Sequence, residues 1–258
     1  MEKISKNQLK YISSLLQKKY RKAENKFLTE GKKLVSEALN SSYPCELLAV
    51  TEKFLASNKS VLNLSGLEPH RIVLTTEKEM ERLADTVNPQ GITGVFGTER
   101  AIKIHRNHKI IVALENISDP GNLGTILRNC DWFGVTEILL SQDCAEVFNP
   151  KVLRASMGSV FHLDVKISAD FYDNLQKLRD NGYKILNSNL NGENIYRFKM
   201  PDKIIAVFSN EANGPTERIS LLADENITIP KFGNAESLNV ASSSAIILSE
   251  IFAANQVV

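Results

Sequence analysis

Short apolar runs alternate with stretches of helical periodicity in the second half of the chain. Residues 109–114 and 204–208 are nearly continuous apolar runs rich in Val and Ile, which is typical of strands buried on both faces of a parallel sheet, and 135–140 is a further predicted strand. Apolar side chains recur at i, i+3, i+4 and i+7 from Leu123 to Cys130, which predicts a helix with one apolar face. Strand, helix and strand in this order form a right-handed crossover unit by default.

The same alternation continues to the C-terminus. It predicts helices at 149–157 and 171–180, strands at 162–167, 183–187 and 227–229, and a closing helix from Val240. Because strands and helices alternate throughout, we expect residues 108–258 to form an α/β domain with a mostly parallel sheet and helices on both faces.

The first hundred residues show the pattern of a second, smaller α/β domain. Helices are predicted at 7–20, which is amphipathic and lysine-rich, and at 32–39, with charged helical segments at 51–56 and 77–84 and strands from Phe27 and at 47–50, 71–75 and 92–96. Residues 98–108 are polar and basic and lack periodicity. We therefore predict two domains, 1–100 and 108–258.

Three loops that follow buried strands carry many polar residues. They span 115–128, 209–214 and 231–239. The first contains the turn sequence Asp119-Pro120-Gly121, after which Asn122 is predicted to cap the helix. Because ligands gather at the carboxyl ends of strands in parallel sheets, we expect the three loops to lie together.

Composition indicates a globular protein. Hydrophobic residues make up 43% of the chain, which is enough for a sizeable core. The N-terminus lacks the apolar region of a secretion signal and no segment approaches the roughly 18 apolar residues of a membrane span, so we expect a cytoplasmic location. Cys45, Cys130 and Cys144 are widely spaced, without a CxxC pair, so neither disulfides nor a metal site is expected. Trp132 and Phe133 are interpreted as core residues.

Positive charge is concentrated at the N-terminus. The net charge of the chain is only +1, yet residues 1–33 contain ten Lys or Arg against three Glu, so the remaining residues sum to −6. A basic segment on a mildly acidic body suits a polyanion such as RNA, while a solvated helix face explains the charge equally well. The candidate RNA-binding residues are Lys18, Lys19, Arg21, Lys22 and Lys32.

Standard nucleotide-binding motifs are absent from the sequence. Gly121-Asn122-Leu123-Gly124 is GxxG rather than the dinucleotide fingerprint GxGxxG, and no GK[ST] follows a glycine-rich loop. The glycine-rich first turn of the common nucleotide-like methyltransferases is also missing.

The three polar loops instead resemble a known family. ENISDPGNLGTILRNCDWFG, SNEANGP and IPKFGNAESLNVASS look like the three ordered motifs of the SpoU (TrmH-like) branch of the SPOUT RNA methyltransferases. Residues 8–97, with YRKAENKFLTEGKKLVSEAL and PQGITGVF, resemble the substrate-binding domain, akin to a ribosomal protein, that many members carry.

This resemblance implies a function and a fold. The function is methyl transfer from S-adenosylmethionine to a ribose 2′-hydroxyl of RNA, with ribosomal RNA favoured over transfer RNA because of the appended domain. The fold implied is a C-terminal trefoil knot in a homodimer with the cofactor near the interface, and periodicity alone predicts no knot because knots are rare exceptions.

The resemblance also implies the site residues. The catalytic candidates are Asn122, Arg128, Glu211, Ser237 and Asn239. Cofactor contacts, mostly through backbone atoms, are expected at Ser209, Asn210, Gly214, Ile229, Lys231 and Leu238. The chain departs from the family pattern at Ser209 and at Ala212, where the family usually has Gly, and a side chain at 212 would resist a positive φ.

Physical chemistry supports a role for the cation. A sulfonium methyl needs in-line placement rather than a metal, so positioning and electrostatics dominate the demands on the protein. The Arg128 guanidinium stays charged and makes forked contacts to phosphate, which favours electrostatic positioning over proton abstraction. Outside this context Arg128 would be read as a surface ion-pair partner, and Glu211 as a cap of the helix that follows it.

Two other functions remain open from the sequence. One is an RNA-binding relative that has lost the donor site, because the second motif is altered. The other is a small-molecule enzyme on an ordinary nucleotide-binding fold, which would lack salt-dependent RNA affinity.

Overall fold

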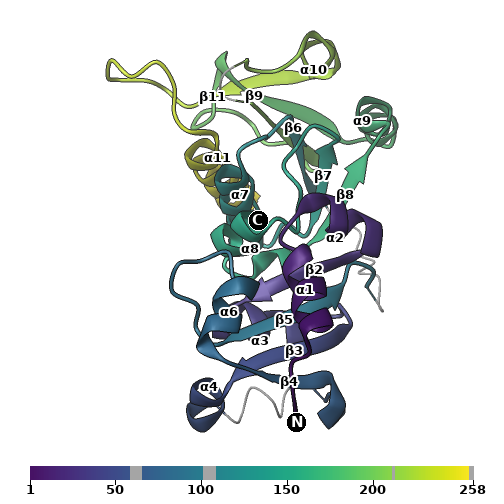
Figure 1. The fold of residues 1–258 in the computed structure, drawn as a ribbon. Coiled ribbons are helices and arrows are strands. Elements are labelled where there is room, and N and C mark those ends of the chain that lie inside the picture. The colour runs from purple at the N-terminus through teal and green to yellow at the C-terminus, as the bar shows by residue number, and fades with distance from the viewer. Residues whose placement is uncertain (59–65, 101–108, 211–212, 256–258) are drawn as a thin grey trace. The chain divides into compact units, whose positions relative to one another are not determined.

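The computed structural model describes residues 1–58, 66–100, 109–210 and 213–255, and they form two compact units (Figure 1). One unit contains Met1–Ile104 together with Phe148–Phe161, and the other contains His105–Val147 together with His162–Val258. The two are called the N-terminal and C-terminal units below. No helix in the described part of the chain is long and apolar enough to cross a membrane.

The N-terminal unit is built on a five-stranded mixed sheet. Its strand order is β1-β4-β3-β5-β2, in which β1, β4 and β3 are parallel and β5 runs antiparallel to both of its neighbours. The strands are β1 (Glu2–Lys3), β2 (Lys26–Glu30), β3 (Cys45–Thr51), β4 (Ile72–Thr75) and β5 (Ile92–Gly97). Apolar clusters on each face of this sheet pack against helices.

Helices cover both faces of the N-terminal sheet. They are α1 (Lys6–Ser14), α2 (Lys18–Glu24), α3 (Lys32–Leu39), α4 (Glu52–Ser57) and α6 (Glu77–Leu83), with the short 3₁₀ helix η1 (Pro69–Arg71) before β4. The predicted strands and helices of this region are present, with one difference.

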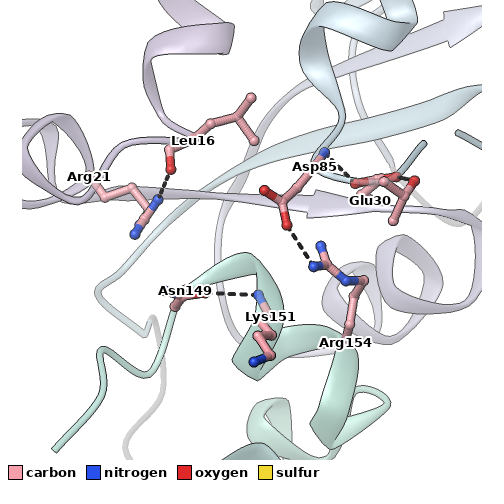
Figure 2. Close-up of polar contacts among 8 residues, drawn as sticks. Leu16, Arg21, Glu30, Asp85, Asn149, Lys151 and Arg154 are labelled. Atoms are coloured by element: carbon pink, nitrogen blue, oxygen red, sulfur yellow. Dashed lines mark hydrogen bonds and ion pairs between the residues drawn. The ribbon is translucent and has the colours of Figure 1, made fainter. Parts of the chain in front are cut away.

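The difference is that the predicted helix at 7–20 is two helices, α1 and α2. Arg21 ends the first one, because its buried guanidinium donates to the carbonyl of Leu16 at 2.7 Å, as Figure 2 shows, and to the carbonyl of Leu15 at 2.8 Å. Ser13 and Ser14 also turn their hydroxyls back onto carbonyls of the preceding turn. The apolar periodicity runs through this break, so the pattern could not reveal it.

A segment from the second half of the chain completes the N-terminal unit. It carries α8 (Pro150–Ser156), which packs against β2, and the short 3₁₀ helix η2 (Ser159–Phe161). The buried Phe27 ring stacks on Phe148 and Phe161, with centroid distances of 4.3 and 6.0 Å. Arg154 of α8 forms an ion pair with Asp85 at 2.6 Å (Figure 2).

The C-terminal unit contains a six-stranded sheet in which all neighbouring strands are parallel. The order is β11-β9-β10-β6-β7-β8. The strands are β6 (Ile110–Glu115), β7 (Glu137–Ser141), β8 (Asp164–Ser168), β9 (Lys184–Asn194), β10 (Ile204–Ser209) and β11 (Glu225–Thr228). The predicted α/β fold with a mostly parallel sheet is therefore confirmed.

Helices lie on both sides of this sheet (Figure 1). On one side α9 (Phe171–Asp180) and α10 (Glu217–Leu222) pack on an apolar cluster. On the other side lie α7 (Pro120–Trp132) and α11 (Val240–Asn255). Asn129 of α7 joins these two helices by donating to the Ala241 carbonyl (2.8 Å) and to the Ser244 hydroxyl (2.9 Å).

Two expectations for the C-terminal unit are corrected by the structure. Trp132 is 83% exposed on α7 and is not a core residue, whereas Phe133 is half-buried and stacks on Phe252 of α11. Strand β9 continues seven residues past the predicted end at Asn187, because its polar extension pairs with β11 after a register shift. Such a polar extension has no apolar signal in the sequence.

Candidate active site

The candidate active site lies at the carboxyl ends of β6, β10 and β11. Each of these strands leads into one of the three polar loops, and β6 and β10 are hydrogen-bonded neighbours in the middle of the sheet. Carboxyl ends of parallel strands are the usual location of ligands in α/β proteins. Hydrogen bonds between the loops show how they are held together.

The loop after β6 is fixed by Asn116 and Asp119. Asn116 has a left-handed backbone, with φ of 57°, and its N–H donates to the Ser141 hydroxyl at 2.9 Å. Asp119 is the N-cap of α7, because its carboxylate accepts from the Asn122 N–H at 2.8 Å. The prediction that Asn122 caps this helix is wrong, since Pro120 begins the helix and Asn122 lies within its first turn.

The Asn122 side chain bonds instead to the third loop. Its Oδ1 accepts a hydrogen bond of 2.9 Å from Asn239 Nδ2. The Oδ1 of Asn239 accepts from the backbone N–H groups of Ala241 (3.0 Å) and Ser242 (3.3 Å), at the start of α11. Two of the predicted catalytic residues, 117 positions apart in sequence, are therefore in direct contact.

The loop after β10 is bonded to the loop after β6. Asn210 Nδ2 donates to the Asn116 carbonyl at 3.1 Å and lies 3.4 Å from the Ser118 hydroxyl. Gly214 adopts a φ of +64°, where a β-carbon is disfavoured, and its N–H donates to the Asn210 carbonyl at 2.8 Å. Glu211 and Ala212 lie outside the described residues, so the predictions for these two positions stay untested.

A cavity of about 400 Å³ opens between the second and third loops. All six residues predicted to contact the cofactor line this cavity, namely Ser209, Asn210, Gly214, Ile229, Lys231 and Leu238. The catalytic candidate Ser237 lines it as well. Its remaining walls include Leu190 of β9 and Val240 of α11. The cavity therefore combines apolar side chains with loop backbone, as small-molecule sites commonly do.

A buried carboxylate lies next to this cavity. Glu115, the last residue of β6, has no exposed surface. Its Oε2 accepts from the Ser209 hydroxyl (2.9 Å) and the Thr216 N–H (3.1 Å), and its Oε1 accepts from the hydroxyls of Thr216 (2.6 Å) and Tyr172 (2.8 Å). Burial, together with the Glu115 charge, raises the pKa of Tyr172 against an opposing hydrogen bond with Thr216.

Arg128 lies on the solvent-facing side of α7. It is exposed, as is Thr125 one turn earlier, and it is not among the residues that line the cavity. Within the described part of the chain no hydrogen bond or ion pair holds Arg128, so the interpretation as a structural ion-pair residue has no support. Its guanidinium is available to an anionic ligand.

Comparison with protein families identifies the C-terminal half. The SpoU rRNA methylase family model matches residues 109–249, which is more than half of the chain. The chain belongs to the SpoU rRNA methylase family. A second model, the MRM3-like substrate binding domain, matches residues 6–94.

Full-length relatives agree with this membership. The chain is 31% identical to the 23S rRNA (guanosine(2553)-2′-O)-methyltransferase RlmP of Bacillus subtilis, over 95% of this chain and 96% of the relative. A TrmH-family RNA methyltransferase structure from Porphyromonas gingivalis matches with a TM-score of 0.84 and 32% identity, over 96% of this chain and 98% of that one. An AdoMet-bound rRNA methyltransferase structure from Sinorhizobium meliloti matches with a TM-score of 0.85 and 27% identity, over 100% and 98%.

The basic candidates of this SpoU family member differ in accessibility. Lys18, Lys19, Lys22 and Lys32 are exposed on the N-terminal unit, whereas Arg21 is buried. Because the Arg21 guanidinium is bonded to the carbonyls that end α1, it is not available to RNA in this structure. Arg21 is therefore a structural residue, contrary to the expectation.

Sequence reasoning assigned no role to Glu115, Thr216 or Tyr172. The sequence offered one signal for Glu115, which is a charged residue directly after the apolar run of β6. Its partners Tyr172 and Thr216 lie 57 and 101 positions away in sequence, so no local pattern pointed to them.

For metals, no cluster of three or more His, Cys, Asp or Glu side chains is found among the residues that the structure describes.

Proposed function

We propose that this protein transfers a methyl group from S-adenosylmethionine to a ribose 2′-hydroxyl of ribosomal RNA. The observation that supports the proposal most directly is the cavity between the second and third loops, which gathers all six expected cofactor residues. The Asn122–Asn239 hydrogen bond joins one wall of this region to α7, the helix that carries Arg128.

The residues around the cavity fit S-adenosylmethionine. The volume of the cavity, about 400 Å³, lies in the range of small-molecule sites, roughly 300–1,000 Å³. Ile229 and Leu238 offer apolar surface to an adenine ring, and the backbone at Ser209 and Gly214 offers polar groups for its edges. When bound, this cofactor supplies an electrophilic methyl group on a sulfonium.

The protein side chains then have positioning tasks. Arg128 holds a phosphate next to the target ribose, and its guanidinium contributes positive charge there. The amides of Asn122 and Asn239 fix the geometry at the start of α7 and α11, and Ser237 supplies a hydroxyl on the cavity wall. Catalysis by positioning is sufficient for an in-line displacement.

Ribosomal RNA is the proposed substrate, bound through the N-terminal unit. The relative RlmP, similar over its whole length, is named for 23S rRNA, and the MRM3-like substrate binding domain matches residues 6–94. The exposed Lys18, Lys19, Lys22 and Lys32 provide the positive charge that phosphates attract. In this proposal residues 1–100 recruit RNA and residues 108–258 carry the methyltransferase site, with no metal.

We also propose a C-terminal trefoil knot in a cytoplasmic homodimer. The proposal of a knot is supported by membership of the SpoU family and by the match to a TrmH-family structure with a TM-score of 0.84. The dimer is supported by the open face of α7, where Arg128 and the 83% exposed Trp132 lie outside the cavity. The resemblance to the SPOUT enzymes predicted both features.

A direct test measures donor binding and methyl transfer separately. The purified protein is expected to bind S-adenosylmethionine in calorimetry and to transfer radiolabelled methyl groups to ribosomal RNA from cells that lack its gene. Arg128→Ala is expected to abolish transfer while leaving the fold and donor binding intact. Thr125→Ala, a change on the same exposed face, is the control and should retain activity.

Other outcomes would reject parts of the proposal. Full activity of Arg128→Ala would remove this residue from the mechanism. RNA binding without donor binding would identify the protein as a non-catalytic RNA-binding relative. Methylation of transfer RNA alone would replace the substrate.

A further inference from the structure

Glu115 occupies a position between the sheet and the donor cavity. Its carboxylate is fully buried at the end of β6 and is one hydrogen bond away from Ser209, a residue of the cavity wall. Four donors surround it, and an ionised carboxylate offers about four acceptor sites, so its hydrogen-bonding capacity is filled.

The donors come from both ends of one cavity wall. Ser209 and Thr216 flank Asn210 and Gly214, which line the cavity, while Tyr172 reaches Glu115 from α9. Among the described residues no cation forms an ion pair with Glu115, so neutral donors alone stabilise its charge. A buried charge with this arrangement has a high cost if one donor is lost, which makes the four contacts mutually dependent.

We infer that Glu115 is a positioning residue for the methyl donor. By holding Ser209 and Thr216 against the end of β6, it preorganises Asn210, Gly214 and Pro215, which lie between them in sequence and line the donor cavity. Preorganisation raises affinity because less conformational entropy is lost on binding. The inference rests on the proposed function, because it takes S-adenosylmethionine as the ligand of this cavity.

The test removes donors to Glu115 that do not themselves line the cavity. Tyr172→Phe deletes one hydroxyl at a distance from the ligand, and Thr216→Val deletes another. Each is expected to raise the dissociation constant of S-adenosylmethionine on the order of tenfold in calorimetry, because the part of the loop that lines the cavity is then no longer held in its binding conformation before the donor arrives. The KM for the donor should rise in parallel, while kcat at saturating donor and the affinity for RNA stay near wild type.

Two further variants separate positioning from general stability. Thr216→Ser keeps the hydroxyl bonded to Glu115 and should restore donor affinity. Ser220→Ala removes an exposed hydroxyl that bonds to the Thr216 carbonyl but not to Glu115, and it should bind the donor as wild type does. These readouts avoid Glu115→Ala, which leaves buried donors unsatisfied and can prevent folding.

The outcomes are distinguishable. Wild-type affinity in both Tyr172→Phe and Thr216→Val would overturn the positioning role of Glu115, even if their melting temperatures fell. A loss of affinity in Ser220→Ala equal to that in Thr216→Val would overturn it as well. Failure of the wild-type protein to bind S-adenosylmethionine would instead refute the proposed function itself.

Discussion

Replacing Phe161 by Ala is expected to destabilise the N-terminal unit by about 3–5 kcal/mol. Phe161 is 3% exposed, and its ring lies 6.0 Å from the centroids of both Phe27 and Tyr43. The change removes a buried aromatic ring and leaves a cavity against Phe27, which has no exposed surface itself. Because domains have a total stability of about 5–15 kcal/mol, this loss is a large part of what holds the unit together.

Hydrogen exchange is the assay that assigns the loss to one unit. Amides of β2 and β5 should exchange faster in Phe161→Ala, because Phe27 of β2 stacks both on Phe161 and on Phe96 of β5, at a centroid distance of 5.7 Å from Phe96. Amides of β6 and β10 belong to the C-terminal unit, so their exchange reports on that unit separately. Exchange in the N-terminal unit should become faster while exchange in β6 and β10 changes little.

A matched control is Val87→Ala, which truncates a 91% exposed apolar side chain in the same unit. It should change stability by less than about 0.5 kcal/mol, as surface substitutions usually do. If Phe161→Ala behaves like this control, or if it destabilises the C-terminal unit alone, then Phe148–Phe161 is not part of the core of the N-terminal unit.

Three further predictions concern the donor site, pH and RNA. Gly214→Ala should weaken S-adenosylmethionine binding in calorimetry, because a β-carbon at the positive φ of Gly214 costs about 1 kcal/mol and shifts the backbone that lines the cavity. Gly182→Ala puts the same strain on a glycine that does not line the cavity, and it should leave donor binding unchanged. Burial alone would raise the pKa of Asp224, but hydrogen bonds from the Ile185 N–H, Arg179 and Lys184 outweigh burial and lower this pKa. The ionised Asp224 therefore stabilises the fold at neutral pH, and this stabilisation is lost as the pH falls below about 4. In urea unfolding, the stability of Asp224→Asn should fall below that of wild type at neutral pH and converge on it below about pH 4. Removing an exposed lysine that contacts phosphate, such as Lys18→Ala, should lower the salt slope of RNA affinity by about one in filter binding, and an unchanged slope would exclude that contact.

Continuous apolar runs made the central strands predictable. Strands β6 and β10 begin and end within one residue of the predicted bounds, because a strand buried on both faces has no polar residue to blur them. Helices α3 and α9 have the predicted bounds, since each has a clear apolar face. By contrast, the break between α1 and α2 depends on which carbonyls the Arg21 side chain binds. The spacing of apolar residues along the sequence does not contain this information.

The site was predictable to the level of loops rather than contacts. Polar residues after buried strands indicated three loops at one edge of the sheet, and the loops do meet there. The bond between Asn122 and Asn239 joins residues from opposite ends of the domain, and the four groups that donate to Glu115 belong to three residues that are 57 to 101 positions away from it. Such convergence is a property of tertiary structure and leaves no local trace in the sequence.

The passage of Phe148–Phe161 into the N-terminal unit has a consequence for how such proteins can be recombined. A gene fusion with one joint near residue 100 would pair residues 1–100 of one parent with the α8 segment of the other, including the positions of Phe148 and Phe161. A chimera that is to keep both units intact needs three joints, with the α8 segment inherited together with residues 1–100. Exchange of the N-terminal unit through a single joint is therefore restricted to relatives whose α8 segments already match.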